Sequence, residues 1–193
     1  MNHDRRPRVW LIGSSIIARL RSYLSANRLD KNLGLKCDII WDGRGGRRWE
    51  HLLPLLHEKR AATHTDPDVI IIHLGGNSIG LPGTNRVDLM CRMKADIHEA
   101  HMLFPNSKIM FSDILPRRVW RHQTAASGYG MERTRRWLNG VMSGYMRELG
   151  MRCIHHREIG LEQLDQDGVH LNVEGNMLFE YILYNALSVE FRS

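Results

Sequence analysis

The sequence has 193 residues, of which 42% are hydrophobic and 25% are charged, and its formal net charge at pH 7 is +6. This is the composition of an ordinary globular protein, which excludes an intrinsically disordered chain, and the length is enough for a buried core. No apolar run approaches the roughly 18 residues that a transmembrane helix needs. We therefore expect a single domain over residues 1–193.

Short apolar runs alternate along the chain with amphipathic segments. The runs end at glycine, serine or proline, which is typical of buried strands, whereas apolar residues at the helical period mark the segments between them. We expect strands over residues 9–12, 37–41, 69–74, 107–114 and 151–155. We expect helices over residues 16–24, 49–56, 86–103, 131–149 and 173–187, the last one capped by Asn172.

This alternation predicts βαβ units and therefore the α/β fold class, with five parallel strands between layers of helices. In such sheets, ligands bind outside the carboxyl ends of the strands. Three turns fall on that edge: Ser14-Ser15 after the first strand, the glycine-rich residues 42–46 after the second, and Gly76-Asn77 after the third.

Five residues on this edge predict acyl transfer. Ser15 begins a helix, where unpaired backbone N–H groups can stabilise an anion, although a serine there is commonly only an N-cap. Asp167 precedes His170 by three residues, so its carboxylate can hold one imidazole nitrogen while the other faces the serine. Gly46 can offer an unhindered backbone N–H, and Asn77 a side-chain NH2, to the oxyanion of a tetrahedral intermediate.

The residues around these positions resemble the SGNH (GDSL-type) hydrolase family, and within it the platelet-activating-factor acetylhydrolase-like esterases. The matching blocks are Gly13-Ser14-Ser15-Ile16, Gly43-Arg44-Gly45-Gly46, Gly75-Gly76-Asn77-Ser78 and Asp167-Gly168-Val169-His170, and Ile114-Leu115-Pro116-Arg117 also fits the branch. The resemblance spans nearly the whole chain. It implies a flavodoxin-like, doubly wound α/β/α fold in three layers. It also implies hydrolysis of short acyl esters without a metal or cofactor, through an oxyanion hole made by the Ser15 N–H, Gly46 and Asn77.

Two positions depart from the family pattern, which usually has Asp where this chain has Ser14 and Ser78. Carboxylates accept stronger hydrogen bonds than hydroxyls do. We therefore expect the loops that carry Ser15 and Asn77 to be held less firmly than in the family. The alternative to an active esterase is a catalytically weak or inactive module on the same fold.

Arginine supplies most of the positive charge. A solvated basic surface accounts for this pattern, and so does a binding site for RNA or an anionic membrane, beside an acyl-ester or lipid-like substrate. Some vertebrate retroelement proteins carry an esterase domain of this kind, so such an origin is a further expectation. The oligomeric state is left open. The clusters are Arg44, Arg47 and Arg48; Arg117, Arg118 and Arg121; and Arg133, Arg135 and Arg136.

The cysteines and histidines suggest neither disulfides nor a metal site. Three widely spaced cysteines predict reduced, buried thiols, and the polar residues 1–8 lack a secretory signal, so we expect an intracellular, cytoplasmic protein or a fragment of a longer one. We expect His73 to be a hydrogen-bonded core histidine. Adjacent residues of a strand face opposite sides, so His155 and His156 do not converge on one metal ion, and we expect both to be surface residues.

Overall fold

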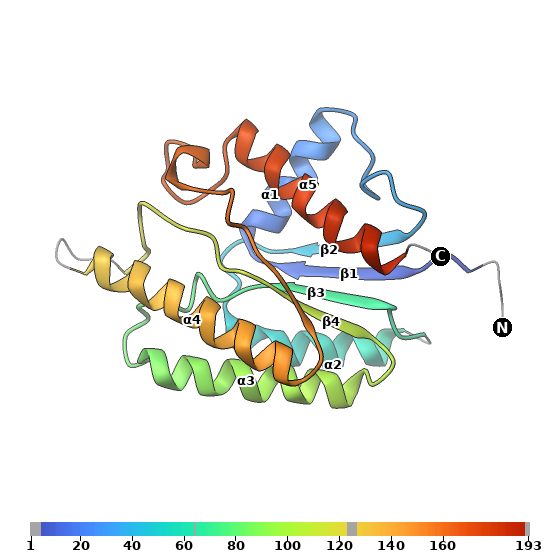
Figure 1. Ribbon diagram of the computed structural model, residues 1–193, viewed down its shortest axis with the longest axis horizontal. Coiled ribbons are helices and arrows are strands. Elements are labelled where there is room, and N and C mark those ends of the chain that lie inside the picture. Colours follow the sequence, from blue (N-terminus) through green and yellow to red (C-terminus); the bar gives the residue numbers. More distant parts are fainter. Residues whose placement is uncertain (1–4, 64, 123–126, 192–193) are drawn as a thin grey trace.

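The computed structural model describes residues 5–63, 65–122 and 127–191 (Figure 1). Its five strands are all parallel and lie in the order β2-β1-β3-β4-β5. The strands are β1 (Arg8–Gly13), β2 (Asp38–Gly43), β3 (Val69–His73), β4 (Lys108–Ser112) and β5 (Arg152–Ile154). The helices are α1 (Ser15–Ala26), α2 (Leu52–Ala62), α3 (Arg86–Leu103), α4 (Gly128–Glu148) and α5 (Val173–Glu190), with short 3-10 turns η1 (Trp49–His51) and η2 (Leu161–Gln163).

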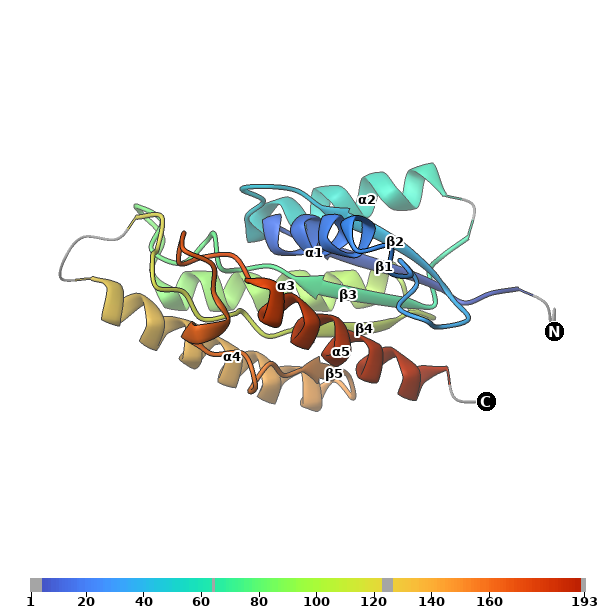
Figure 2. The same ribbon diagram turned by 90° about the horizontal axis from the view of Figure 1, so that it is seen from above.

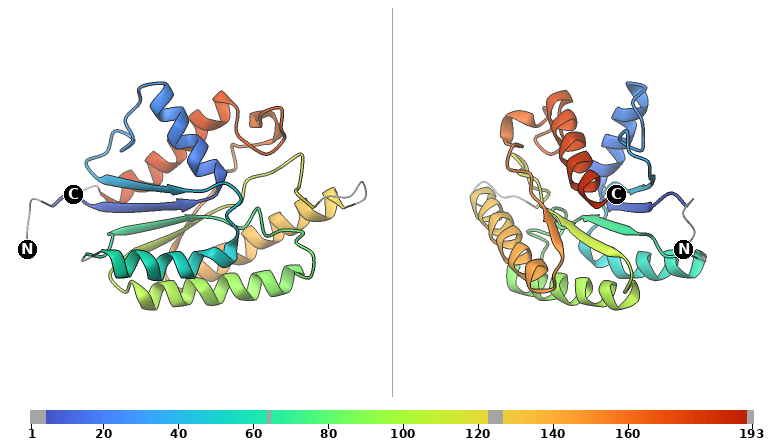
Figure 3. Two further views of the ribbon diagram at one scale, coloured as in Figure 1. Left: turned by 180° about the vertical axis from the view of Figure 1, so that it is seen from behind. Right: turned by 45° about the vertical axis from the view of Figure 1, so that its right-hand side comes forward.

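The helices form two layers, one on each face of the sheet. Helices α1 and α5 cover one face, and α2, α3 and α4 cover the other (Figures 1 and 2). Side chains of β1 alternate between the two cores, with Trp10 and Ile12 toward α2–α4 and Val9 and Leu11 toward α1 and α5. The predicted three-layer α/β/α fold is confirmed, and Figure 3 shows it from two further sides.

The strand order places a topological switch between β1 and β3. Strand β1 pairs with β2 on one side and with β3 on the other. The chain therefore first adds β2 on one side of β1 and then crosses to the other side of β1 to add β3. The register puts Gly13, the last residue of β1, beside Gly43 of β2 and His73 of β3. The loops that follow these three strands therefore start at the same level, at the edge where doubly wound sheets bind ligands.

Most predicted elements are confirmed, and the largest difference is the end of α2, which continues to Ala62 and not only to residue 56. Helix α4 begins at Gly128 rather than at residue 131, because the Met131 N–H donates to the Ser127 carbonyl at 3.0 Å and so closes a helical turn ahead of the apolar face. Residues 123–126 of the predicted loop 117–130 lie outside the described residues. The predicted cap of α5 is present, since the Asn172 side chain accepts a hydrogen bond from the Gly175 N–H at 2.8 Å. No helix in the described ranges has both the length and the apolar character needed to cross a membrane.

Two expectations about single residues are wrong. Cys37 is buried and Cys153 half-buried, but Cys91 is exposed, because it lies on the outer side of α3 while Met93 faces the core. His156 is buried and not a surface residue, because it follows the end of β5 and packs under α5. His155, as expected, is exposed.

His73 and His156 are joined inside the core through one serine hydroxyl. Ser112 Oγ lies 2.9 Å from His73 Nδ1 and 2.7 Å from His156 Nε2, and the ring of Phe179 packs against both imidazoles. Burial lowers the pKa of His73 to about 3, with a further contribution from the charge of Arg117. Burial likewise holds the pKa of His156 well below its ordinary value. Both imidazoles are therefore neutral in the folded protein at neutral pH.

This neutral pair predicts a steep loss of stability in mild acid. Below pH 6.5 the two imidazoles gain protons only in the unfolded chain, so unfolding takes up protons and its free energy falls as the pH falls. The expected loss for two such histidines between pH 7 and pH 5 is about 4 kcal/mol. Urea unfolding at pH 7, 6 and 5 measures it. His156→Gln should halve the loss and His98→Gln, on the exposed side of α3, should not change it; a pH-independent free energy in the unsubstituted protein contradicts the prediction.

Candidate active site

The turn between β1 and α1 places Ser15 at the carboxyl edge of the sheet. Ser14 is the N-cap residue and Ser15 the first residue of α1. A Cβ atom on Gly13 would lie 2.1 Å from Ile17 Cγ1, and one on Gly43 would lie 2.3 Å from the Ala18 backbone nitrogen. Only glycine permits this approach, so the first turn of α1 rests directly on the ends of β1 and β2.

The structure brings Ser15, His170 and Asp167 into one hydrogen-bonded chain. Ser15 Oγ lies 2.8 Å from His170 Nε2, and His170 Nδ1 lies 2.6 Å from Asp167 Oδ2. An ionised carboxylate can only accept, so Nδ1 carries the proton and Nε2 accepts from the Ser15 hydroxyl. This is the arrangement by which a histidine takes the proton of a serine nucleophile.

Asp167 also builds the loop that holds His170. Its Oδ1 accepts the backbone N–H groups of Val169 and His170, each at 2.9 Å, while Gly168 supplies the left-handed turn at φ 69°. Partial burial opposes ionisation of Asp167, but hydrogen bonds from the backbone and ring of His170 and from Val169 hold its pKa below its usual range. Asp167 therefore stays ionised at neutral pH, although its side chain is 41% exposed.

The two other predicted residues follow β2 and β3 on the same edge. Gly46 is exposed and has φ 73°, and no acceptor within the described ranges is bonded to its backbone N–H. The Asn77 carboxamide is held from two sides, since its Nδ2 donates to the Arg47 carbonyl at 3.0 Å and its Oδ1 accepts from Arg117 Nη1 at 3.1 Å. One hydrogen of the Asn77 NH2 therefore remains available to a ligand.

Arg47, which the sequence places in a basic surface cluster, joins two loops at the edge of the sheet. Its guanidinium donates to the carbonyls of Gly13, at 3.2 Å, and Asp42, at 2.6 Å, and pairs with the Asp42 carboxylate at 2.8 Å. The side chain thus ties the loop after β2 to the last residue of β1. Its only signal in the sequence is its place in the glycine-rich block, which does not distinguish it from Arg44 or Arg48.

The two serines that replace family carboxylates behave differently. Ser78 is buried, and its Oγ accepts the backbone N–H of Trp49 at 2.8 Å, so the loop after β3 is bonded to the loop after β2 without a carboxylate. Ser14 is 5% exposed and makes no side-chain capping hydrogen bond. It lines a small cavity together with His73 and Arg117.

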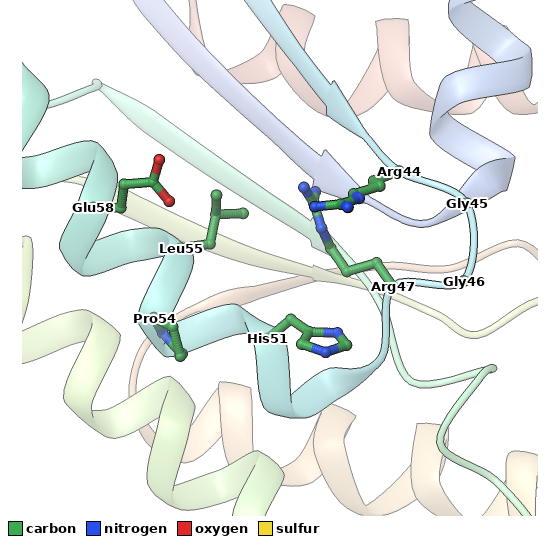
Figure 4. Close-up of a pocket in the computed structure, with 8 residues that line it drawn as sticks. All are labelled: Arg44, Gly45, Gly46, Arg47, His51, Pro54, Leu55 and Glu58. Carbon is green, nitrogen blue, oxygen red and sulfur yellow. The ribbon is translucent and has the colours of Figure 1, made fainter.

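A groove of about 390 Å³ opens beside Gly46 (Figure 4). Its walls are the loop after β2, and η1 and α2, whose side chains are shown in the figure; it is lined by Arg44, Gly45, Gly46, Arg47, His51, Pro54, Leu55 and Glu58. Polar and apolar groups contribute equally to the lining. The groove includes the predicted oxyanion donor Gly46. Within the described ranges, His, Cys, Asp and Glu side chains form no group of three or more that could hold a metal ion.

The predicted basic clusters are only partly exposed. Nearby carboxylates form ion pairs with Arg47, Arg48, Arg135 and Arg136. Arg117 is buried. In the part of the chain that the structure describes, the cluster members that are exposed and lack an acidic partner are Arg44, Arg118, Arg121 and Arg133.

The model of the GDSL-like Lipase/Acylhydrolase family matches residues 11–178 of the chain. No curated protein matches it. A GDSL-like lipase from Bacteroides thetaiotaomicron VPI-5482 is similar in structure, with a TM-score of 0.72 and 16% identity over 95% of this chain and 89% of that chain. A catalytic mutant of an acetylxylan esterase from Geobacillus stearothermophilus has a TM-score of 0.68 and 16% identity, over 96% of this chain and 95% of that one. A psychrotrophic esterase from Pseudoalteromonas sp. has a TM-score of 0.62 and 13% identity, over 96% of this chain and 99% of that chain.

At these identities, the likeness to solved structures shows a shared fold. The family match goes further, because it extends over most of the sequence and contains all the candidate residues, namely Ser15, Gly46, Asn77, Asp167 and His170. The chain therefore belongs to the GDSL-like lipase/acylhydrolase family of carboxylic ester hydrolases.

Proposed function

We propose that this chain is a serine esterase for short-chain, acetyl-type esters, with Ser15 as nucleophile, His170 as general base and acid, and Asp167 as the group that orients His170. The observation that carries the proposal is the chain of two hydrogen bonds, 2.8 Å from Ser15 Oγ to His170 Nε2 and 2.6 Å from His170 Nδ1 to Asp167 Oδ2. Each role has the group that its chemistry requires.

In the proposed reaction, Ser15 Oγ attacks the ester carbonyl carbon while its proton passes to His170 Nε2. The tetrahedral intermediate collapses when His170 returns that proton to the departing alcohol oxygen, which leaves the acyl group on Ser15. A water molecule then attacks the acyl carbon and gives one proton to His170. The bond between Ser15 Oγ and the acyl carbon breaks as His170 returns that proton to Oγ, which releases the carboxylic acid and free Ser15. The ionised Asp167 stabilises the imidazolium that appears in both halves of the cycle.

The negative oxygen of the intermediate is assigned to three donors: the backbone N–H groups of Ser15 and Gly46 and the free hydrogen of Asn77 Nδ2. This is supported by their place after three adjacent strands in register, and by the uncommitted N–H of Gly46. Preorganised donors at this point are expected to contribute a large share of the rate enhancement.

Preference for short acyl chains is supported by the groove beside Gly46, in which Pro54 and Leu55 are the apolar side chains, beside Arg44, Arg47, His51 and Glu58. Membership of the platelet-activating-factor acetylhydrolase-like branch is supported by the block Ile114-Leu115-Pro116-Arg117. The retroelement origin and the intracellular location stay predictions from the sequence.

A non-catalytic module that binds RNA or an anionic membrane is the second candidate. It rests on the exposed arginines Arg44, Arg118, Arg121 and Arg133. It is the weaker candidate because ion pairs or burial occupy the other members of the three clusters. A salt-sensitive mobility shift with RNA, or sedimentation with anionic vesicles, in a protein that has no esterase activity would favour it.

Ser15→Ala should abolish hydrolysis of p-nitrophenyl acetate and covalent labelling by a fluorophosphonate. The fold should survive, because the only side-chain hydrogen bond of Ser15 within the described residues is the one to His170, and such a surface bond contributes on the order of 1 kcal/mol. Ser14→Ala is the matched control and should keep its labelling. Undiminished turnover in a clean Ser15→Ala preparation would sink the proposal.

Asn77→Ala should lower kcat by on the order of 100-fold or more and change KM much less, since an oxyanion donor acts mainly in the transition state. Steady-state kinetics with p-nitrophenyl acetate give both constants. If KM alone rises, Asn77 binds the ground-state substrate and its assignment to the oxyanion is wrong.

Ser14→Asp tests whether the β1–α1 turn is held less firmly because Ser14 stands where the family usually has Asp. A carboxylate at this N-cap could accept backbone N–H groups of α1 and would line the same cavity as the Arg117 guanidinium. We expect the thermal midpoint to rise by about 2–4 °C, as for a gain near 1 kcal/mol in a chain of this size, and kcat to rise as the turn is held more firmly. Ser14→Asn controls for side-chain size without the charge. A lower thermal midpoint together with a lower kcat would refute the expectation that Ser14 leaves this turn less firmly held.

A further inference from the structure

Arg117 is a buried cation beside the proposed oxyanion hole. It follows β4, and only 9% of the residue is exposed. Its guanidinium lies 5.3 Å from the centre of the Trp120 ring. Its Nη2 lies so near Gly76 that a Cβ atom on Gly76 would be only 2.5 Å from this nitrogen. The loop after β4 thus packs, through this side chain, on the loop after β3.

No carboxylate within the described ranges forms an ion pair with Arg117, in contrast to the half-buried Arg135, which pairs with Glu132 at 2.5 Å. Burial lowers the pKa of Arg117 to about 10, so the side chain is still protonated at neutral pH. A buried charge without a counter-ion loses hydration, and the Trp120 ring and the hydrogen bond to Asn77 replace only part of it. Arg117 therefore does not stabilise the fold by its charge.

The contacts of Asn77 indicate what Arg117 does. A carboxamide can be turned by 180°, which exchanges its oxygen and its nitrogen. In the observed orientation, Oδ1 faces the Arg117 donor and Nδ2 faces the Arg47 carbonyl. In the other orientation, an NH2 would face the guanidinium and an oxygen would face a carbonyl, so both bonds would be lost and like groups would oppose each other. Arg117 and the Arg47 carbonyl together select one orientation.

We propose that Arg117 is a positioning residue for the esterase reaction, which holds the Asn77 carboxamide so that its free N–H points at the oxyanion. The inference rests on the proposed function. The free hydrogen of Nδ2 has a fixed direction only while both bonds persist. Without Arg117, the carboxamide is held from one side, and part of the population presents its oxygen, which repels the oxyanion.

The test compares Arg117→Met with Arg117→Lys. Methionine keeps much of the length but neither donor nor charge, so kcat should fall by on the order of 10- to 100-fold with little change in KM, as for a misplaced oxyanion donor. Lysine keeps a donor that can reach Asn77 Oδ1, and it should recover a large part of kcat. Arg118→Met is the matched control, because Arg118 is the next residue, is exposed, and among the described residues donates its side chain only to the Leu161 carbonyl. The kcat of this variant should stay unchanged.

A double-mutant cycle with Asn77→Ala shows whether Arg117 acts through Asn77. Once the carboxamide is gone, Arg117→Met should lower kcat by no more than about 3-fold further, whereas independent effects would multiply. The thermal midpoint is measured in parallel. It should stay level or rise in Arg117→Met, and it should fall in Arg135→Met, which leaves Glu132 without this partner and the Ile114 carbonyl with only the Asn139 amide as a donor among the described residues.

Three results would overturn the inference: an unchanged kcat in Arg117→Met, multiplicative losses in the cycle, or a fall in the thermal midpoint as large as that of Arg135→Met. The esterase proposal fails separately, if the unsubstituted protein neither hydrolyses p-nitrophenyl acetate nor labels with a fluorophosphonate, and the positioning role then falls with it. An active parent with an equally active Arg117→Met variant removes the positioning role alone.

Discussion

The close approach of α1 to the ends of β1 and β2 is the constraint on which the site depends. Gly13 and Gly43 meet atoms of the first turn of the helix, and one of these is a backbone nitrogen, which cannot turn aside as a side chain can. Since Ser15 is the first residue of that helix, its distance from the sheet is set by backbone packing. His170 must then be held at a fixed position relative to Ser15. The hydrogen bonds that Asp167 accepts from the backbone of Val169 and His170 give the loop the shape that this position requires.

Arginine side chains and a serine hydroxyl join the other loops. Arg47 crosses from the loop after β2 to the end of β1, Arg117 packs on the loop after β3, and Ser78 accepts a hydrogen bond from the backbone of Trp49. The family resemblance led us to expect looser loops because two carboxylates are missing. For the loop after β3, the bonds of Ser78 and Arg117 supply contacts in their place. At Ser14 no side-chain hydrogen bond of this kind caps the helix.

Charge is unevenly distributed around Ser15. On the side of His170 lies the ionised Asp167, and on the side of Asn77 lies the protonated Arg117. The buried His73 shares a small cavity with Arg117 and is neutral. This distribution favours a positive imidazole on one side and a negative oxygen on the other, which are the charges that develop together when a serine adds to an ester.

The periodicity of the sequence by itself determined the order of strands and helices, and therefore a parallel sheet whose loops meet at one edge. It also determined the pair Asp167 and His170, because a spacing of three residues in a turn brings two side chains together locally. Only the tertiary structure decided which cations are buried. The sequence places Arg117 in a predicted surface cluster. Its partner Asn77 is 40 residues away and lies in the loop that follows a different strand. The same holds for His156, which meets Ser112 across 44 residues. Burial of such side chains depends on which distant segment packs over them, and a local pattern of residues does not contain that information.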